Sequence, residues 1–263
     1  NRTIMINHKL ANIHPNAKIG KNVIIEPFAT IYEDVVIGDN CWIASNAVVM
    51  SGARIGNNCK IFPGAIISAE SQDLKYNGEY AITEIGDNTT IREYVTIHKG
   101  TLDKKITKVG SNCLLMSYVH VAHDCTVGDN VVIANLVQLA GHVIVGDWVI
   151  IEGTAAIQQF VSIGQHSFIA GGSLVRKNVP PYVKAAREPL SYIGVNTIGL
   201  RRRGFNDQQI INIEDIYRVI YVQNSNMTTA LRVADLEIPV SEEKEVILEF
   251  IRNSTKGIMR GLS

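Results

Sequence analysis

The sequence has no excess of charge of either sign, no long apolar run and no closely spaced cysteines. Its 25 basic and 25 acidic residues give a formal net charge of zero. Nucleic acids select basic surfaces, so we expect no nucleic-acid partner. A membrane-spanning helix needs about 20 apolar residues in succession, and we expect no membrane span. The first residues do not follow the basic and then apolar pattern of a secretory signal, so we expect none.

Cysteine is scarce, with four residues in a chain of 263. Cys41, Cys59, Cys113 and Cys125 form no CxxC pair, so the spacing of a zinc finger is missing. All four occupy the same position of a six-residue repeat, which predicts a packing role, because a buried cysteine behaves as a small apolar residue. Unpaired thiols are typical of a reducing compartment, and we expect a cytoplasmic protein.

The dominant feature of the sequence is this six-residue repeat. From Ile13 to Val175 every sixth residue is Ile, Val or Leu, except Asp73, Glu79 and Asp103. Two residues before each aliphatic position stands Ala, Val, Cys, Ser or Thr. Neither the helical period of 3.6 nor the strand period of 2 produces this pattern. It predicts the wall of a parallel β-helix, in which one large and one small residue per repeat point inward.

Glycine gives the length of one coil. It follows the aliphatic residue every 18 positions, at Gly20, Gly38 and Gly56 and again at Gly110, Gly128, Gly146 and Gly164. Coils of three walls, stacked about 4.8 Å apart, are therefore expected. The glycine expected at position 74 stands instead at Gly86, and the one then expected at position 104 stands at Gly110. These delays predict loops near 68–84 and 98–108, and loops on a rigid scaffold commonly carry function.

The repeat ends at Val179-Pro180-Pro181, and the pattern that follows is helical. Asn206 with Gln209 three residues on has the form of a capping box, and Ser241 has the form of a second helix cap. A shorter helix is expected near 228–236. We predict a β-helix domain over 1–181 and a helical domain over 182–263.

Histidines gather where the second loop is expected. With three repeats in each coil and the insertion removed, His98, His123, Asp124 and His142 stack along one edge, with His120 nearby. A histidine beside a carboxylate can act as a general base. Two other interpretations are open at this point. Three histidines can bind zinc, as in β-helical carbonic anhydrases, and a polar stack can be a solvated edge without chemistry.

Three further features are weaker. Gly141 places a backbone amide beside the histidines, where it could stabilise an oxyanion or only serve a turn. Asp73 and Lys75 in the first loop could hold sugar hydroxyls or only solvate the loop. The triplet Arg201–Arg203 could bind phosphates or form a solvated face.

At these residues the chain resembles the acyl-carrier-protein–UDP-N-acetylglucosamine O-acyltransferase family, the first enzymes of lipid A synthesis. The resemblance runs from about residue 10 to the C-terminus and rests on segments that the repeat does not explain. These segments are Gln72-Asp73-Leu74-Lys75-Tyr76, Ile91-Arg92-Glu93, Val95-Thr96-Ile97-His98, Ala122-His123-Asp124-Cys125-Thr126-Val127-Gly128, Leu139-Ala140-Gly141-His142, Gln159-Phe160, Val179-Pro180-Pro181-Tyr182, Gly194-Val195-Asn196 and Arg202-Arg203-Gly204-Phe205.

The resemblance implies a left-handed β-helix that forms a homotrimer with active sites between subunits. It implies transfer of a fatty acyl group, typically 3-hydroxylated, from acyl carrier protein to the 3-hydroxyl of UDP-N-acetylglucosamine, without a cofactor or catalytic metal. His123 would be the general base, Asp124 its orienting partner and Gly141 the oxyanion donor. The residues implied to bind substrate are Asp73, Lys75, His98, His120, His142, Gln159, Gly171, Asn196, Arg202 and Arg203, with Gly171 beside the acyl tail.

Three positions depart from the family pattern. Gln158 stands where a histidine is common, Ile198 where an acidic residue is common, and Glu152 where a glycine is common. These departures concern substrate contacts and acyl-chain selection rather than the base.

Other functions remain open on the sequence. The related N-acyltransferases carry a domain before their repeats, whereas here the repeats start at residue 13. A zinc hydratase would use His98, His120 and His123, and a scaffold protein would need none of them. If an acidic carrier protein binds, a basic surface is expected, and the candidates are Arg201–Arg203, Lys184 and Arg187.

Overall fold

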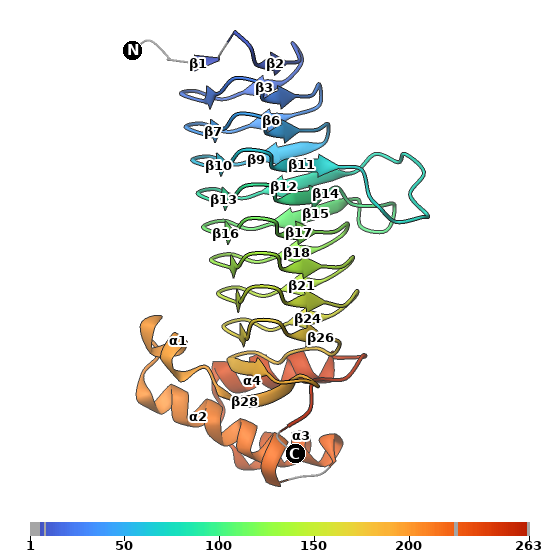
Figure 1. Cartoon of the computed structure of the whole chain (residues 1–263). Helices are drawn as coiled ribbons and strands as arrows, with labels where there is room; N and C mark the ends of the chain where they lie inside the picture. Colours follow the sequence, from blue (N-terminus) through green and yellow to red (C-terminus); the bar gives the residue numbers. More distant parts are fainter. Residues whose placement is uncertain (1–5, 8, 224–225, 262–263) are drawn as a thin grey trace.

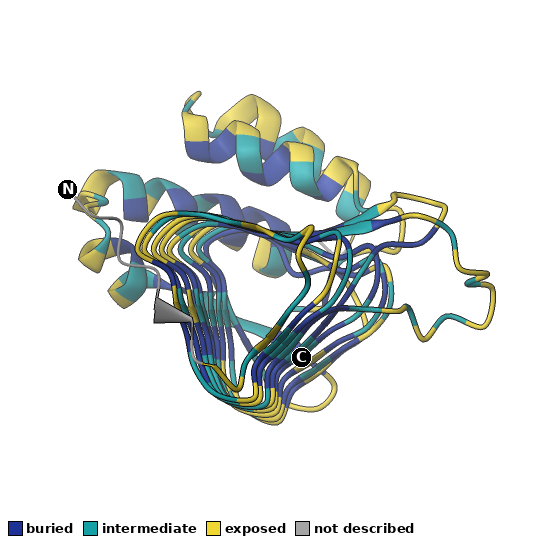
Figure 2. Ribbon diagram, turned by 90° about the horizontal axis from the view of Figure 1, so that it is seen from above, coloured by how far each residue is buried: buried dark blue, intermediate teal, exposed yellow. Residues whose placement is uncertain are grey.

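The computed structural model describes residues 6–7, 9–223 and 226–261. Most of the chain forms a left-handed parallel β-helix, which ends in a helical region (Figure 1). Seen along its axis the β-helix is a triangular prism with three flat walls (Figure 2). The parallel β-helix predicted from the six-residue repeat is therefore confirmed, and so is the left hand that the family resemblance implied.

Each wall is one sheet that takes a strand from every coil. The first sheet contains β1 (Ile6–Asn7), β4 (Ile24–Ile25), β7 (Trp42–Ile43), β10 (Lys60–Ile61), β13 (Thr90–Ile91), β16 (Leu114–Leu115), β19 (Val132–Ile133), β22 (Ile150–Ile151), β25 (Phe168–Ile169), β27 (Val183–Ala186) and β28 (Ser191–Val195). The second contains β2 (Asn12–Ile13), β5 (Thr30–Ile31), β8 (Val48–Val49), β11 (Ile66–Ala69), β14 (Thr96–His98), β17 (His120–Val121), β20 (Gln138–Leu139), β23 (Ala156–Ile157) and β26 (Leu174–Val175). The third contains β3 (Lys18–Ile19), β6 (Val36–Ile37), β9 (Ala53–Ile55), β12 (Ile82–Ile85), β15 (Ile106–Val109), β18 (Thr126–Val127), β21 (Ile144–Val145) and β24 (Ser162–Ile163).

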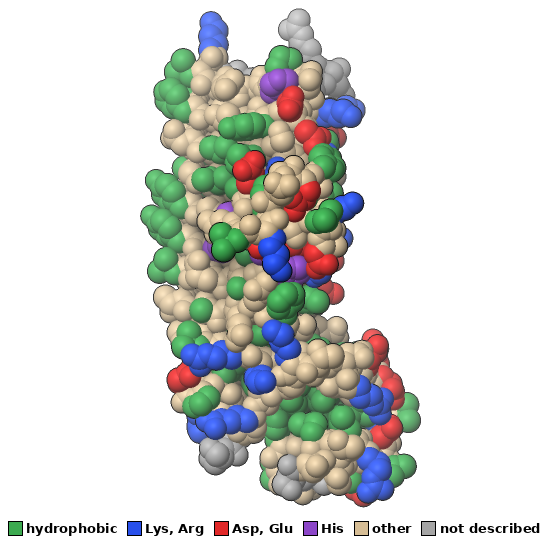
Figure 3. Space-filling view, turned by 90° about the vertical axis from the view of Figure 1, so that its right-hand side faces the viewer, with side chains coloured by type: hydrophobic (Ala, Val, Ile, Leu, Met, Phe, Trp, Pro, Cys, Tyr) green, Lys and Arg blue, Asp and Glu red, His purple; other side chains and the backbone are tan. Residues whose placement is uncertain are grey.

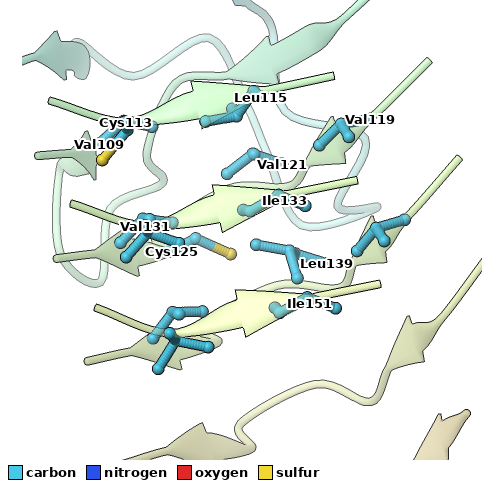
Figure 4. Packing of buried hydrophobic residues seen from close by; sticks show 14 of the residues in the cluster. Val109, Cys113, Leu115, Val119, Val121, Cys125, Val131, Ile133, Leu139 and Ile151 are labelled. Carbon is cyan, nitrogen blue, oxygen red and sulfur yellow. The ribbon is translucent and has the colours of Figure 1, made fainter. Parts of the chain in front are cut away.

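The interior of the prism is filled by the aliphatic and the small residue of each repeat (Figure 4). Leu115, Val121 and Ile133 have no solvent exposure. All four cysteines are free and buried, as their place in the repeat predicted. Burial raises the pKa of Cys113 to about 11 and that of Cys125 to about 12. Neither is a thiolate at neutral pH, which supports a packing role.

The glycines recur once in every coil because the next coil leaves no room for a side chain. A Cβ at Gly128 would run into the carboxylate of Asp147 and the backbone of Gly146. That carboxylate accepts the amide hydrogen of Asp129 at 2.8 Å. One coil earlier in the chain, the carboxylate of Asp129 accepts the amide hydrogen of Ser111 at 2.7 Å. The glycine period thus reflects a ladder of side chains that each bind the backbone of the coil before.

Two loops interrupt the coils between the second and the third sheet (Figure 1). In a coil without a loop, Thr126 pairs with Ile144. Ile66 pairs instead with the more distant Thr96, and Ile82 pairs with Ile106, so both of these coils contain extra residues. The insertions are those that the glycine spacing predicted. The first loop covers residues 70–81 and the second 99–105, because the flanking strands extend into the ranges expected to be loops.

The C-terminal region begins with two strands that the helical pattern did not predict. β27 pairs in parallel with β25, and β28 pairs antiparallel with β27, so both extend the first sheet. The helices are α1 (Thr197–Arg202), α2 (Asp207–Arg218), the π-helix η1 (Val219–Gln223), α3 (Met227–Glu237) and α4 (Glu242–Arg252). Asn206 and Gln209 form the capping box, and Ser241 caps α4. The division of the chain at residue 181 stays a prediction. No helix in the described ranges is long and apolar enough to cross a membrane.

Replacing Thr83 by valine is expected to stabilise the protein. Thr83 Oγ1 is the one buried side-chain polar atom without a hydrogen-bond partner in the described part of the chain. An unpaired buried hydroxyl costs about 1–3 kcal/mol, and valine has the same shape. Thr107 pairs with Thr83 in the sheet, and its hydroxyl accepts the amide hydrogen of Asp124 at 2.8 Å. Denaturant unfolding should therefore show a gain for Thr83→Val and a loss for Thr107→Val, and equal losses would contradict this account.

Candidate active site

The prism has three edges, and the edge between the second and third sheets carries both loops. We call it the second edge. Histidine and acidic side chains are visible on the side of the molecule from which the loops project (Figure 3). The first edge joins the first and second sheets, and the third edge joins the third sheet to the first sheet of the next coil. Along the second edge the chain turns between β17 and β18 through Ala122, His123 and Asp124. Asp124 takes a left-handed backbone conformation with φ of 59°, which aspartate tolerates better than most residues.

His123 and Asp124 form a hydrogen-bonded pair. Nδ1 of His123 lies 2.9 Å from Oδ2 of Asp124. Asp124 has no solvent exposure, whereas His123 is 8% exposed. An ionised carboxylate can only accept hydrogen bonds, so Nδ1 carries the proton of the neutral imidazole. Nε2 is left with a free lone pair, as a general base requires.

The second loop holds the carboxylate of Asp124. The Thr101 hydroxyl donates to Oδ2 at 2.6 Å, the Thr101 amide donates to Oδ1 at 2.9 Å, and the Lys104 amide approaches Oδ1 at 3.3 Å. Burial alone would raise the pKa of Asp124, but the hydrogen bonds from Thr101 and His123 outweigh it and hold this pKa below the ordinary value of a carboxyl. Asp124 is therefore ionised at neutral pH.

Gly141 lies against the ring of His123, one coil further along the edge. A Cβ at this position would be 2.5 Å from Nε2 of His123, so only glycine lets the ring lie there. No hydrogen bond within the described residues uses the Gly141 amide, whereas the His142 amide donates to the His123 carbonyl at 3.0 Å. The Gly141 N–H is thus available to an anion beside Nε2 of His123.

Replacing Gly141 by alanine is expected to lower kcat of the protein's reaction about 100-fold, because a displacement of a reacting group by about 1 Å reduces the rate by about this factor. The new methyl group would push the imidazole away from its position, while Asp124 holds the other side of the ring. The methyl group lies at the surface of a cavity and not in the core, so Tm should change little. A variant with normal kcat would contradict the close contact of Gly141 and His123.

His142 also packs against the ring of His123. The two rings meet edge to face at 5.1 Å, and the His142 ring stacks on Phe160 at 4.5 Å. Nδ1 of His142 is 3.4 Å from a carboxylate oxygen of Asp103, and Nε2 is 3.7 Å from Oδ2 of Asp124. Burial lowers the pKa of His142, so it is a neutral neighbour of the pair.

His98 and His120 form a second histidine pair. Their rings meet edge to face at 4.9 Å, and Nδ1 of His120 lies 2.8 Å from the Thr96 hydroxyl. Burial, with His98 nearby, lowers the pKa of His120 to about 4, and burial also lowers the pKa of His98. Both rings are therefore neutral hydrogen-bonding groups at physiological pH.

These depressed pKa values predict a pH dependence of stability. Between the ordinary histidine pKa of about 6.5 and the folded value of about 4 for His120, the unfolded chain binds a proton that the folded chain does not. The free energy of unfolding should therefore fall as the pH is lowered from about 6.5 towards about 4. Unfolding at a series of pH values should give a smaller slope for His120→Asn than for the wild type, with His14→Asn as the control. An unchanged slope would contradict the prediction.

Two neighbouring cavities open at the second edge. One of about 510 Å³ lies over the second sheet and is lined by Gln72, Asp73, His120, Ala122, His123, Gln138, Leu139, Ala140, Gly141, Ala156, Ile157 and Gln159. Another of about 610 Å³ is lined by Asp73, Lys75, Glu79, Thr101, Leu102, Asp103, His142, Gln159 and Phe160. Asp73 and Gln159 border both cavities, and Oδ2 of Asp73 is 3.9 Å from Nε2 of His123. His123 thus borders one of two neighbouring cavities and His142 the other, and each cavity can hold part of a substrate.

The structure does not bring every candidate residue to the second edge. Gly171 lies on the first edge, where its amide donates to the carboxylate of Glu152 at 3.0 Å. Asn196 and Arg203 lie at the third edge, where both contact His166. Within one chain these residues are separate from His123.

Two of the three arginines at 201–203 already have partners within the chain. Arg201 forms an ion pair with Asp207 at 3.1 Å, and Arg203 is half-buried with its guanidinium over the ring of Trp148. Arg202 is exposed, as is Ile198. Among the cations expected for carrier docking, Arg203 therefore has a packing role as well.

The histidine trio expected for zinc does not assemble in the described residues. The one group there with at least three candidate ligand atoms within 4.8 Å is His123, Asp124 and His142. Its carboxylate already accepts hydrogen bonds from Thr101 and from His123. His98 and His120, which the zinc interpretation required, lie outside this group.

Comparisons with known proteins show the family of the chain. The family model for bacterial transferase hexapeptide repeats matches residues 34–69 and 106–141, and the model for domain 2 of UDP-N-acetylglucosamine O-acyltransferase matches residues 178–259. An acyl-[acyl-carrier-protein]–UDP-N-acetylglucosamine O-acyltransferase of Sulfurihydrogenibium is 52% identical over 95% of this chain and 93% of its own length. The Trichlorobacter lovleyi protein of the same name is 50% identical over 97% and 99%. The chain belongs to this O-acyltransferase family.

A solved structure of the O-acyltransferase family has the same fold throughout. The UDP-N-acetylglucosamine acyltransferase of Bacteroides fragilis has a TM-score of 0.96 and 49% identity, over 97% of this chain and 100% of that one. The chain therefore shares both the β-helix and the C-terminal region with its relatives. Thr101 and Lys104 could not be identified from the repeat pattern, because their contacts with Asp124 depend on how the second loop folds back.

Proposed function

We propose that the protein moves a fatty acyl group, of the 3-hydroxyacyl type, from acyl carrier protein to the 3-hydroxyl of UDP-N-acetylglucosamine, the first step of lipid A synthesis. The observation that carries this proposal is the His123–Asp124 pair beside the free amide of Gly141. A base and an oxyanion donor at one point are what acyl transfer to an alcohol requires.

The proposed reaction uses three groups of the chain. Nε2 of His123 takes the proton of the sugar 3-hydroxyl as its oxygen attacks the thioester carbonyl carbon. Asp124 keeps the proton on Nδ1 and stabilises the imidazolium that forms. The Gly141 N–H donates to the oxyanion of the tetrahedral intermediate. When the carbon–sulfur bond breaks, the proton on Nε2 goes to the leaving thiolate, which returns His123 to its neutral form.

We assign the residues around the pair to substrate binding. Asp73 and Gln159 border both cavities and Lys75 borders the one of about 610 Å³, and all three side chains can form hydrogen bonds with a sugar. His120 and His142 line the cavities as neutral rings. His98 packs edge to face against the ring of His120, and we assign it to the support of that ring.

We further propose a homotrimer with a composite site. Gly171 is on the first edge and Asn196 and Arg203 are at the third edge, so one chain cannot bring them to His123. A second copy that packs against the second sheet could place such groups, with Arg202, over the cavity. The setting is proposed to be cytoplasmic, in agreement with four free thiols.

The test is a transfer assay with purified protein, UDP-N-acetylglucosamine and a panel of acyl carrier protein thioesters. Formation of the sugar ester in the presence of a chelator is expected, and the preferred thioester gives the chain length and hydroxylation. If no thioester supports transfer, the proposed function is wrong. Transfer that chelator abolishes would point instead to a metal site at the second edge.

A further inference from the structure

We infer that Thr101 is a positioning residue for the reaction, because its hydroxyl fixes the Asp124 carboxylate that orients His123. This inference rests on the proposed function and extends it to the second loop. The Thr101 hydroxyl donates to Oδ2 of Asp124 at 2.6 Å, and the Thr101 amide donates to Oδ1 at 2.9 Å. One residue thus holds both oxygens of the carboxylate.

Two histidine side chains lie near the carboxylate of Asp124. Oδ2 of Asp124 is 2.9 Å from Nδ1 of His123 and 3.7 Å from Nε2 of His142. A rotation of the carboxylate would exchange these contacts and release the base. The two bonds from Thr101 restrain this rotation, since one residue binds both oxygens. They therefore select His123 as the partner.

The burial of the site makes this hydrogen bond important. Asp124 has no solvent exposure and Thr101 is 8% exposed, so water cannot readily replace the hydroxyl. Hydrogen bonds to an ionised acceptor are about twice as strong as neutral ones, and in a buried site an unmet acceptor is costly. Among the described residues, Oδ2 accepts hydrogen bonds from the Thr101 hydroxyl and from Nδ1 of His123. If the hydroxyl is removed, the bond from His123 alone remains at this oxygen.

The second loop is built to hold Thr101 in place. A side chain at Gly100 would run into the backbone of Ile106, so the loop closes tightly. The Lys105 amide donates to the Thr101 carbonyl at 2.7 Å. The neighbouring Leu102 amide donates to the carboxylate of Glu79 in the first loop at 3.0 Å. Thr101 is therefore fixed by bonds on both sides before any substrate binds.

The experiment compares Thr101→Val with Thr101→Ser in the transfer assay. Valine keeps the shape of the side chain and the hydrogen bond of the backbone amide but removes the hydroxyl. We expect kcat to fall about 10-fold, because the base is then slightly misplaced. KM for UDP-N-acetylglucosamine and for the carrier protein should stay within about 2-fold, and Thr101→Ser should restore most of kcat. Thr83→Val, the same change at a buried threonine of strand β12, is the control and should keep normal kcat.

A double variant tests whether Thr101 acts through Asp124. In an Asp124→Asn background the Thr101→Val change should have no further effect on kcat, because the carboxylate it serves is gone. A full effect in that background, normal kcat for Thr101→Val, or failure of serine to restore activity would each overturn the inference while wild-type transfer still supports the proposed function. Absence of transfer by the wild type would overturn both.

Discussion

Replacing His123 by alanine is expected to lower kcat about 1,000-fold, within the range that a general base contributes. Nε2 of His123 is the basic atom beside the free Gly141 amide, and the His123 ring borders the cavity over the second sheet. His142 cannot replace it, because burial lowers the pKa of His142 and its ring is stacked on Phe160. Activity is measured as ester formation from UDP-N-acetylglucosamine and an acyl carrier protein thioester.

The control for this variant is His14→Ala. His14 lies near the N-terminal end of the β-helix, in a separate cavity with Asn12 and Tyr32, so its loss should leave kcat unchanged. The chelator is kept in every assay, so that loss of a metal cannot explain a difference between variants. If His123→Ala retained more than about a tenth of wild-type kcat, the base would have to be another residue.

The fold could be predicted from the sequence because each coil has the same packing requirements. Every wall needs one large and one small inward residue, and the third edge of each coil needs a glycine beneath the side chain of the next coil. The insertions were visible for the same reason, since a rigid period makes any extra residue stand out. Strands β27 and β28 were not predicted, because the period has ended there and their pairing depends on contacts distant in sequence.

The candidate site could be predicted only where it follows the coil period. His123 and His142 are separated in the sequence by one coil and one residue. Their ring centroids lie 5.1 Å apart because consecutive coils stack on each other. Two other contacts depend on the paths of the loops. The first loop brings Asp73 to His123, and the second brings the Thr101 hydroxyl to the carboxylate of Asp124. No repeat specifies such paths. A sequence of this kind therefore indicates the functional residues on the scaffold and leaves those on the insertions to the structure.

Replacing Asp124 by asparagine is expected to lower kcat by a similar factor of about 1,000, because it places the proton on the wrong nitrogen of His123. Oδ1 of Asp124 faces the amides of Thr101 and Lys104, which can only donate. The oxygen of asparagine must take that position, so its NH₂ group faces Nδ1 of His123. The imidazole then accepts at Nδ1 and carries its proton on Nε2, where it cannot take one from the sugar hydroxyl.

The same argument explains why the change should leave the fold intact. Asparagine adopts the left-handed backbone of residue 124, where φ is 59°, as readily as aspartate does. The Thr101 hydroxyl can turn to accept from the new NH₂ group, so no buried polar atom loses its partner. We expect normal Tm and normal KM for both substrates together with the loss of kcat. Near-normal kcat would mean that His123 does not depend on the carboxylate, and the Thr101 inference would lose its basis.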